Sequence, residues 1–173
     1  MFEPQFHDTR VRPLDKADLK LVLSWRNHPE VRRYMYTKHE ITPDEHQDWF
    51  DSAQQDPRKH LLVFEANSLP LGFVNFNEYV TRQIANWGYY AAPNAPKGSG
   101  RALGRAALNY AFNDIKLHKV CGQALDFNER SIKFHQTFGF QLEGTLRDHH
   151  FDGEGYHHVL CFGLLSHEWQ PKF

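Results

Sequence analysis

The sequence predicts one α/β domain, spanning residues 1–173, in which about four helices flank a mixed sheet of about seven strands. Strand-like and helical apolar patterns follow one another along the chain in the order β-α-α-β-β-β-α-β-α-β-β. Short turns join some successive strands and helices join others. Antiparallel and parallel pairs should therefore both occur, with helices on both faces of the sheet.

The N-terminal third should contain a short strand, at residues 11–14, followed by two helices. Asp15 can cap the first helix. This helix should run to about Asn27, because His-Pro follows and the residue before proline avoids helical angles. The second helix should span residues 42–55. Its start is the clearest local signal, with a Thr cap, Pro at the first helical position and Glu three residues after the cap.

The rest of the chain should form most of the sheet. A Gly-rich turn at residues 96–100 leads into an apolar helix that should end near Leu117, and its wide apolar arc indicates a largely buried helix. A further helix is expected at residues 128–138, and an Asp-Gly pair predicts a hairpin between the last two strands. The remaining strands are expected at residues 61–66, 71–76, 86–90, 119–127, 140 onward and 156–165.

Composition and charge exclude several partners. The formal net charge of −1 argues against bulk electrostatic binding of nucleic acid. No apolar run approaches the ~18 residues that a membrane-spanning helix needs, and the N-terminus lacks the pattern of a signal peptide. Cys121 and Cys161 lie in apolar runs and should be free thiols. We therefore expect a cytoplasmic protein with no nucleic-acid or membrane partner.

The 12 histidines suggest a metal site, but their placement argues against one. The His149-His150 and His157-His158 pairs flank the predicted hairpin turn, so one histidine from each strand could share a face. Two ligands on one face are too few for a closed zinc site, which uses four. Exposed histidines, or a contact in a homodimer, explain these pairs better, and no metal is expected.

The segment 97–104, Lys-Gly-Ser-Gly-Arg-Ala-Leu-Gly, follows a strand and opens a helix. Main-chain N–H groups at such a helix start can hold phosphate oxygens, with Lys97 and Arg101 as cationic support. A dinucleotide fingerprint does not fit, because Gly104 falls one residue late, and the Gly-Lys-Ser/Thr ending of a P-loop is absent. A plain turn that needs glycine for its angles would also account for the segment.

A second constellation lies on the helix that begins at Asn128. Asn128, Ser131 and His135 are spaced i, i+3 and i+7, so they share one helix face. With Phe138-Gly139-Phe140, this helix resembles the second motif of the GNAT superfamily of N-acetyltransferases, Asn-x-x-Ala/Ser-Ile-x-x-Tyr-x-x-x-Gly-Phe. The segment 97–102 resembles the pyrophosphate loop of the same superfamily, Gln/Arg-x-x-Gly-x-Gly/Ala, with Lys in the usual Gln/Arg place.

Both motifs occur in the right order and about 30 residues apart. The resemblance to the superfamily extends over residues 11–169. It implies a GNAT fold with a mostly antiparallel sheet, a core at residues 61–165 that binds acetyl-CoA, and direct transfer of the acetyl group to an amine. It implies the following residues for the coenzyme: Tyr90, Ala91, Lys97, Gly98, Ser99, Gly100, Arg101, Ala102, Leu103, Asn128 and Ser131.

Two positions depart from the superfamily pattern and concern proton transfer. His135 occupies the place of a Tyr that commonly protonates the departing CoA thiolate. We hypothesise that His135 is this general acid, which would require it to keep its proton; alternatively it only lines the cofactor site. Asn86 occupies the place of a Glu that often acts as a base. Glu78, on a neighbouring strand, is the candidate base, although it could equally be a surface carboxylate.

The acceptor is expected to bind the elements at residues 15–56. The segments 23–32 and 44–50 resemble the UDP-amino-sugar N-acetyltransferases of the pseudaminic acid pathway, which supplies flagellin glycosylation. This resemblance implies acetylation of the 4-amino group of UDP-4-amino-4,6-dideoxy-N-acetyl-β-L-altrosamine. The expected substrate-binding residues are Trp25, Arg26, Asn27, His46 and Trp49.

Arginine forks suit a pyrophosphate and aromatic rings suit a uracil, although Trp25 and Trp49 could equally be core anchors. The alternatives are a protein N-terminal alanine as acceptor and a CoA-binding module without turnover. A polyamine fits less well, because residues 26–38 are predominantly basic.

Overall fold

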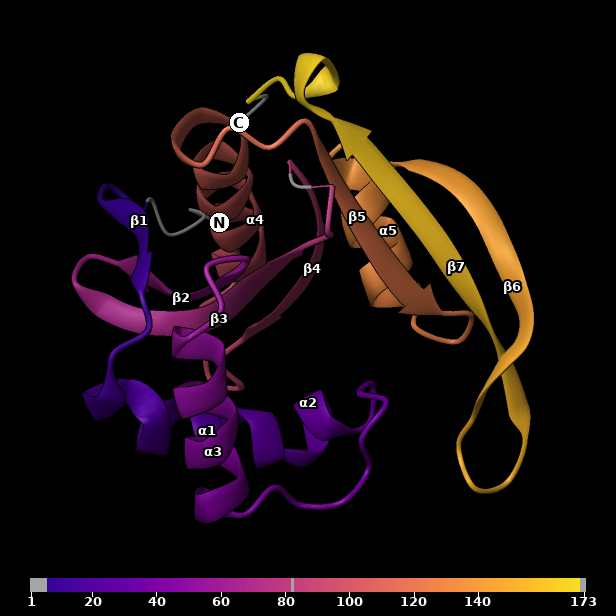
Figure 1. Cartoon of the computed structure of the whole chain (residues 1–173), viewed down its shortest axis with the longest axis horizontal. Coiled ribbons are helices and arrows are strands. Elements are labelled where there is room, and N and C mark those ends of the chain that lie inside the picture. The colour runs from indigo at the N-terminus through magenta and orange to yellow at the C-terminus, as the bar shows by residue number, and fades with distance from the viewer. Residues whose placement is uncertain (1–5, 82, 172–173) are drawn as a thin grey trace.

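The computed structural model describes residues 6–81 and 83–171 (Figure 1). The outermost residues of the predicted domain, including most of the segment considered for a signal peptide, lie outside these ranges. The strands are β1 (Thr9–Pro13), β2 (Lys59–Ala66), β3 (Leu69–Glu78), β4 (Ile84–Ala91), β5 (Lys119–Leu125), β6 (Gln141–Phe151) and β7 (Tyr156–Leu165). The α-helices are α1 (Leu19–Asn27), α2 (Pro29–Arg32), α3 (Pro43–Gln54), α4 (Ser99–Asn109) and α5 (Glu129–Thr137).

The seven strands form one sheet in the order β1-β2-β3-β4-β5-β7-β6. β4 and β5 run parallel, and every other neighbouring pair among these strands is antiparallel. The predicted α/β class with a mixed, mostly antiparallel sheet is therefore confirmed. The β6–β7 hairpin extends away from the helices at the far end of the sheet (Figure 1).

The predicted start of the second N-terminal helix is confirmed, whereas Asp15 caps a short 3-10 turn, Lys16–Asp18, and α1 begins after it at Leu19 without a side-chain cap. The Thr42 hydroxyl accepts a hydrogen bond from the Glu45 N–H at 3.2 Å, and the Glu45 carboxylate accepts one from the Thr42 N–H at 2.8 Å. This capping box satisfies two donors at the start of α3. α1 ends at Asn27 as predicted. However, Pro29 starts the short extra helix α2, because proline suits the first helical position.

The predicted helix after the Gly-rich turn changes its character partway along. α4 is regular only to Asn109, and Tyr110–Asp114 continue it as a π-helix. The apolar arc extends through both parts: Leu108 and Phe112 are buried in the same cluster. Apolar spacing alone therefore located the helical segment but could not distinguish these two kinds of turn.

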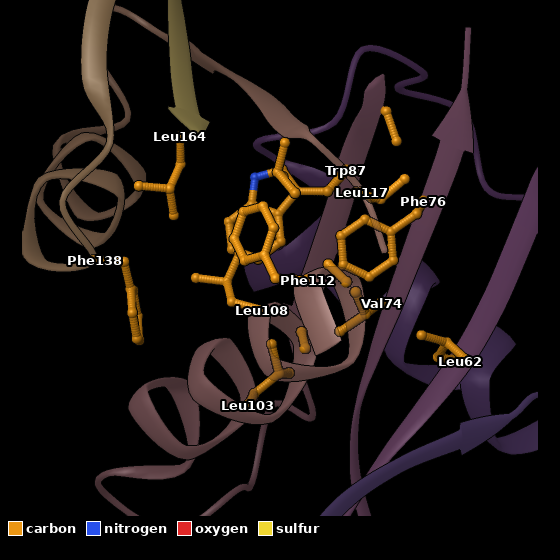
Figure 2. Close-up of a cluster of buried hydrophobic side chains, with 14 of the residues drawn as sticks. Leu62, Val74, Phe76, Trp87, Leu103, Leu108, Phe112, Leu117, Phe138 and Leu164 are labelled. Carbon is orange, nitrogen blue, oxygen red and sulfur yellow. The ribbon is translucent and has the colours of Figure 1, made fainter. Parts of the chain in front are cut away.

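Helices cover both faces of the sheet, and each face has its own apolar cluster. One cluster joins the sheet to α4, the π-helix and α5, and Figure 2 shows part of it, with Phe76 and Trp87 of the strands next to Leu108 and Phe112. The other cluster lies on the opposite face and joins the sheet to α1 and α3. The helix pair α1 and α3 is thereby fixed against the N-terminal half of the sheet. Within the described residues, no helix is both long and apolar enough to cross a bilayer.

The parallel strands β4 and β5 stay paired only at their beginnings. Pairing extends from Ile84 with Lys119 to Asn86 with Cys121, and the strands then diverge (Figure 1). Gly122 is the first β5 residue past this point. Its α-carbon faces His135 Nε2 and Trp87 Nε1 so closely that an added Cβ would overlap both rings. The divergence of the two strands thus occurs where two ring side chains pack directly on the main chain.

We predict that Gly122→Ala lowers the free energy of unfolding by about 1–3 kcal/mol, because the added methyl group displaces two buried rings. Gly144→Ala, on β6, is the matched control, since its added methyl group would meet no atom within 4 Å. Urea unfolding of both variants measures the difference. Equal stability of the two variants would contradict this account of the packing.

Candidate active site

A cavity of about 1110 Å³ opens where β4 and β5 diverge. Its walls come from β4 and β5, the starts of α4 and α5, and the acceptor-side elements α1, α2 and α3. The cavity therefore joins the two segments that the sequence assigned to a coenzyme and to an acceptor.

The first turn of α4 forms one end of the cavity. Gly98 caps the helix with a φ of 94°, a left-handed conformation that favours glycine. A Cβ added to Gly100 would meet no atom within 4 Å, so the helix start faces open space there. Ser99 is buried, and its hydroxyl has no hydrogen-bond partner among the described residues. The Ser99 N–H already donates to Pro96 O at 3.1 Å. The rest of the helix start, with the Ser99 hydroxyl, fits a phosphate group.

The open edge of β4 forms a second wall. The Ala92 N–H donates to Leu71 O on β3, so by alternation the N–H groups of Ala91 and Tyr89 point away from β3. No described strand pairs with β4 on that side after Asn86. These N–H groups are therefore available to amide and carbonyl oxygens of a ligand. The Tyr90 N–H points towards β3, so, unlike the Ala91 N–H, it is not available to a ligand.

The polar face of α5 lines the cavity as predicted. Asn128 Oδ1 accepts a hydrogen bond from the Ser131 N–H at 3.1 Å and so caps the helix. The Ser131 hydroxyl lies 3.2 Å from the hydroxyl of Tyr89. Of the residues expected to bind the coenzyme, only Ala102 is absent from the lining; it points into the core and is 6% exposed.

His135 has a different role from the one predicted. It is 1% exposed, its Nδ1 lies 2.8 Å from Ser131 O, and its Nε2 accepts a hydrogen bond from Trp87 Nε1 at 3.1 Å. Burial lowers the pKa of His135 to about 4. The ring is therefore neutral at physiological pH, with Nδ1 as donor and both nitrogens engaged. These contacts argue against His135 as the general acid. The residue lines the cavity, in keeping with the alternative that the sequence left open.

Glu78 is also not placed as predicted. It lies at the end of β3, where its carboxylate bonds His60 Nε2 at 2.9 Å and the Gln83 N–H at 3.1 Å. It does not line the cavity, so its assignment as the catalytic base is corrected. The cavity instead contains the side chains of Asn75, Asn77 and Asn86. Strand spacing could not show that Glu78 is engaged in the turn to β4.

The acceptor side of the cavity contains an arginine with an unsatisfied donor. Arg26 Nη1 is buried and has no hydrogen-bond partner among the described residues, and Nη2 makes only a long contact of 3.5 Å to Thr37 O. Burial lowers the pKa of Arg26. Beside it, His46 stacks on Trp49 with centroids 5.0 Å apart, and burial followed by the charge of Arg26 lowers the pKa of His46. All three side chains line the cavity.

Two predicted substrate residues are structural instead. Trp25 is 6% exposed and packs in the apolar cluster between α1 and the sheet. The Asn27 side chain makes two 2.8 Å hydrogen bonds to the main chain of Ile41, one as donor and one as acceptor. It therefore fixes the segment that leads into α3. Neither residue lines the cavity, and both predictions are corrected.

Tyr89 and Gln123 line the cavity but were not among the predicted site residues. Tyr36, between α2 and α3, donates a hydrogen bond to Gln123 Oε1 on β5 at 3.0 Å. Tyr34 stacks on Phe127 with centroids 6.3 Å apart. The segment after α2 therefore reaches the β5 side of the molecule. The aromatic residues Tyr34 and Tyr36 were the only sequence feature that pointed to this contact. Their partners, Phe127 and Gln123, are too distant in the sequence to be identified from it.

No group of three or more His, Cys, Asp or Glu side chains among the described residues could hold a metal ion. Among the hairpin histidines, His157 Nε2 lies 2.7 Å from Asp152 Oδ2, and His158 Nδ1 accepts a hydrogen bond from the Asp148 N–H at 3.0 Å. His150 Nε2 is buried and has no hydrogen-bond partner among the described residues.

Residues 8–141 match the Acetyltransferase (GNAT) domain family. The chain belongs to this family. It is 30% identical to acetyltransferase PseH of Campylobacter jejuni over 80% of this chain and 86% of the relative. It is 25% identical to the spermidine N(1)-acetyltransferase of Escherichia coli K12, over 96% and 90%. A solved spermidine N-acetyltransferase from Vibrio cholerae, in complex with CoA and spermine, shares the fold with a TM-score of 0.86 at 23% identity, covering 92% of this chain and 96% of that one.

The GNAT chain is thus an acyl-CoA-dependent N-acetyltransferase. The names of its relatives include spermidine and phosphinothricin as acceptors. The predicted superfamily and enzyme class are confirmed. The cavity described above contains the α4 start and the α5 face that carried the resemblance.

We predict that His135 makes this GNAT domain sensitive to mild acid. Its pKa is about 4 in the folded state and about 6.5 when unperturbed. Between these values the unfolded chain binds the proton and the folded chain does not, so stability is complete above about pH 6.5 and falls as the pH drops towards 4. The loss approaches about 3 kcal/mol.

Urea unfolding across this pH range should show a shallower pH dependence for His135→Gln than for the wild type. His118→Gln, at an exposed histidine, is the control and should keep the wild-type slope. The pH slope is compared rather than the absolute stability, because the substitution also removes packing. An unchanged slope in His135→Gln would refute the assignment.

Proposed function

We propose that this enzyme transfers the acetyl group of acetyl-CoA to the 4-amino group of UDP-4-amino-4,6-dideoxy-N-acetyl-β-L-altrosamine, a step of pseudaminic acid synthesis for flagellin glycosylation. The observation that carries the proposal is the partly buried guanidinium of Arg26 on the acceptor side of the cavity, whose buried Nη1 has no hydrogen-bond partner among the described residues. The similarity to acetyltransferase PseH over most of both chains supports the proposal, together with the resemblance of residues 23–32 and 44–50 to UDP-amino-sugar N-acetyltransferases.

The coenzyme fits the half of the cavity between α4 and α5. Its pyrophosphate would lie on the N–H groups that open α4, where Gly100 leaves open space and the Ser99 hydroxyl lacks a partner among the described residues. Lys97 and Arg101 line the same end. The pantetheine arm would lie along the open edge of β4, near Asn128 and Ser131. When bound, acetyl-CoA supplies the thioester that the amine attacks.

The acceptor fits the half of the cavity between α1 and α3. A buried cation without a partner is costly, and an anionic ligand would remove that cost. The diphosphate of a UDP-sugar would meet Arg26, since guanidinium groups bind phosphate oxygens through two N–H groups. The adjacent pair of His46 and Trp49 presents stacked rings for a uracil.

The main chain and the acceptor complete the chemistry. The N–H groups on the open edge of β4 can stabilise the oxyanion that forms at the thioester carbonyl. His46 is held neutral by burial, so a proton acceptor is present beside Arg26. Cys121 and Cys161 are both free thiols, in keeping with a reaction in the cytoplasm.

Spermidine is the second candidate acceptor, because spermidine acetyltransferases are as similar over most of the chain. Two acids, Glu30 and Glu45, are among the residues that line the cavity. However, the Glu45 carboxylate is already bonded to His39 and to the cap of α3. A polycation would also have to approach the unsatisfied charge of Arg26, so the electrostatics favour the anionic acceptor.

Acceptor kinetics with Arg26→Gln test the proposal. Thiol release should saturate with the UDP-4-amino sugar, and Arg26→Gln should lower kcat/KM for this acceptor about 10- to 100-fold, because a hydrogen-bonded charge is lost. The KM for acetyl-CoA should not change. Arg32→Gln is the control, since Arg32 lies outside the cavity and pairs with exposed Glu40.

The wild type could instead acetylate spermidine faster than the UDP-sugar, and Arg26→Gln could raise kcat/KM for spermidine further. That result would refute the proposal and favour the polyamine function.

We also predict that Gly100→Ala weakens coenzyme A binding roughly tenfold or more, because its methyl group occupies the space assigned to phosphate oxygens. Stability should not fall, since that methyl group meets no protein atom within 4 Å and alanine favours a helix. Calorimetric titration with coenzyme A measures the affinity, with Gly144→Ala as the control. Unchanged affinity would place the phosphates elsewhere.

A further inference from the structure

We propose that Tyr89 is the catalytic residue that donates a proton to the departing CoA thiolate. The proposal concerns acetyl transfer from a CoA thioester and does not depend on which amine accepts the acetyl group. It assigns a role to a side chain that lies on β4 rather than on α5, where the family pattern would place the donor.

The reaction needs a proton donor that His135 cannot be. Breaking the carbon–sulfur bond leaves an electron pair on sulfur, and protonation of this thiolate makes departure favourable. His135 is neutral, and its one N–H is directed at the Ser131 carbonyl. Its other ring nitrogen accepts a hydrogen bond from Trp87. The ring therefore has no proton to give while these two hydrogen bonds persist.

Tyr89 brings a hydroxyl group to the same face of α5. It lies two residues after Trp87 on β4, so the two side chains point to the same side of the sheet. Its hydroxyl lies 3.2 Å from the Ser131 hydroxyl, one helical turn before His135. Its ring stacks on Phe134 with centroids 4.4 Å apart and an interplanar angle of 26°. The hydroxyl is thus held in a fixed position at the cavity wall.

The main chain of Tyr89 adds a second argument. Its N–H points to the open edge of β4, where the thioester is proposed to lie, and its side chain lines the same cavity. Three other tyrosines line the cavity; Tyr34 stacks on Phe127, and the remaining two hydroxyls are less suited. Tyr90 points to the opposite face, where it packs against Phe73 near Arg26. The Tyr36 hydroxyl donates to Gln123.

The proton balance closes without a further reactant. The amine nitrogen forms a bond to the thioester carbon, the carbon–sulfur bond breaks, and its electron pair moves to sulfur. The Tyr89 O–H proton passes to sulfur and gives the free thiol. The amine loses one proton, and Tyr89 regains one through the Ser131 hydroxyl and solvent. The products are the amide and coenzyme A, with Tyr89 restored.

The protonation state of Tyr89 suits a donor. Burial raises its pKa well above the usual value for tyrosine, so the phenol keeps its proton throughout the physiological range. A general acid works below its pKa, so the rate should not fall as the pH rises from about 6.5 to about 9. A histidine acid would lose activity over this interval, because it would become deprotonated.

Tyr89→Phe is the direct test, because it keeps the ring on Phe134 and removes only the hydroxyl. Thiol release from acetyl-CoA should show kcat lowered about 10²- to 10³-fold, with the Kd for coenzyme A unchanged by calorimetry. Tyr110→Phe is the matched control: this tyrosine also stacks on an aromatic ring, Phe76, but lies outside the cavity.

A second measurement separates catalysis from packing. Replacement of Tyr89 by 3-fluorotyrosine keeps the hydroxyl and the stacking, so kcat should stay within about tenfold of the wild-type value. Unchanged kcat in Tyr89→Phe, or a fluorotyrosine variant as slow as Tyr89→Phe, would overturn the proposal. Both assays are run with the UDP-4-amino sugar and with spermidine. If only spermidine is acetylated, the acceptor proposal fails while the role of Tyr89 is still tested.

Discussion

The hydrogen bond from Trp87 to His135, packed over Gly122, is the constraint on which the rest of the site depends. It lies where β4 and β5 stop pairing and so fixes the point of divergence. The opening between the strands exposes the main chain of β4 on one edge. It also places the starts of α4 and α5 on the walls of one cavity. A wider side chain at Gly122, or a charged ring at His135, would disturb all of these features together.

The same constraint explains why His135 is unsuited to acid catalysis. A histidine that must accept a hydrogen bond from an indole has to be neutral, and burial enforces that state. One residue cannot both stabilise the divergence as a neutral acceptor and supply a proton as a cation. Separation of the two tasks requires a second side chain with a proton at neutral pH. A buried phenol meets this requirement, because the burial that removes the proton from a histidine retains it on a tyrosine.

The sequence predicted the fold and the coenzyme side of the cavity well, because those features are local. The cap of α3, the end of α1 and the start of α4 each follow from a few adjacent residues. Side-chain surroundings are not local, and the errors lie there. Asn27 and Glu78 carry suitable chemistry, but both are engaged by main-chain groups beyond their own element. Periodicity could place Ala102 on α4 but could not say which side of that helix the cavity occupies.

The two ends of the cavity differ in the charged and polar groups that line them. The coenzyme end offers main-chain N–H groups and the cations Lys97 and Arg101, which any CoA-dependent enzyme of this family could use. At the acceptor end, the buried Nη1 of Arg26 has no hydrogen-bond partner among the described residues. A polycation could not accept a hydrogen bond from it and would be repelled by the positive charge of the guanidinium. Because similarity is divided between PseH and spermidine acetyltransferases, the fold does not decide the acceptor. The proposed anionic acceptor therefore rests on the partly buried guanidinium of Arg26 and not on the superposition of the backbone.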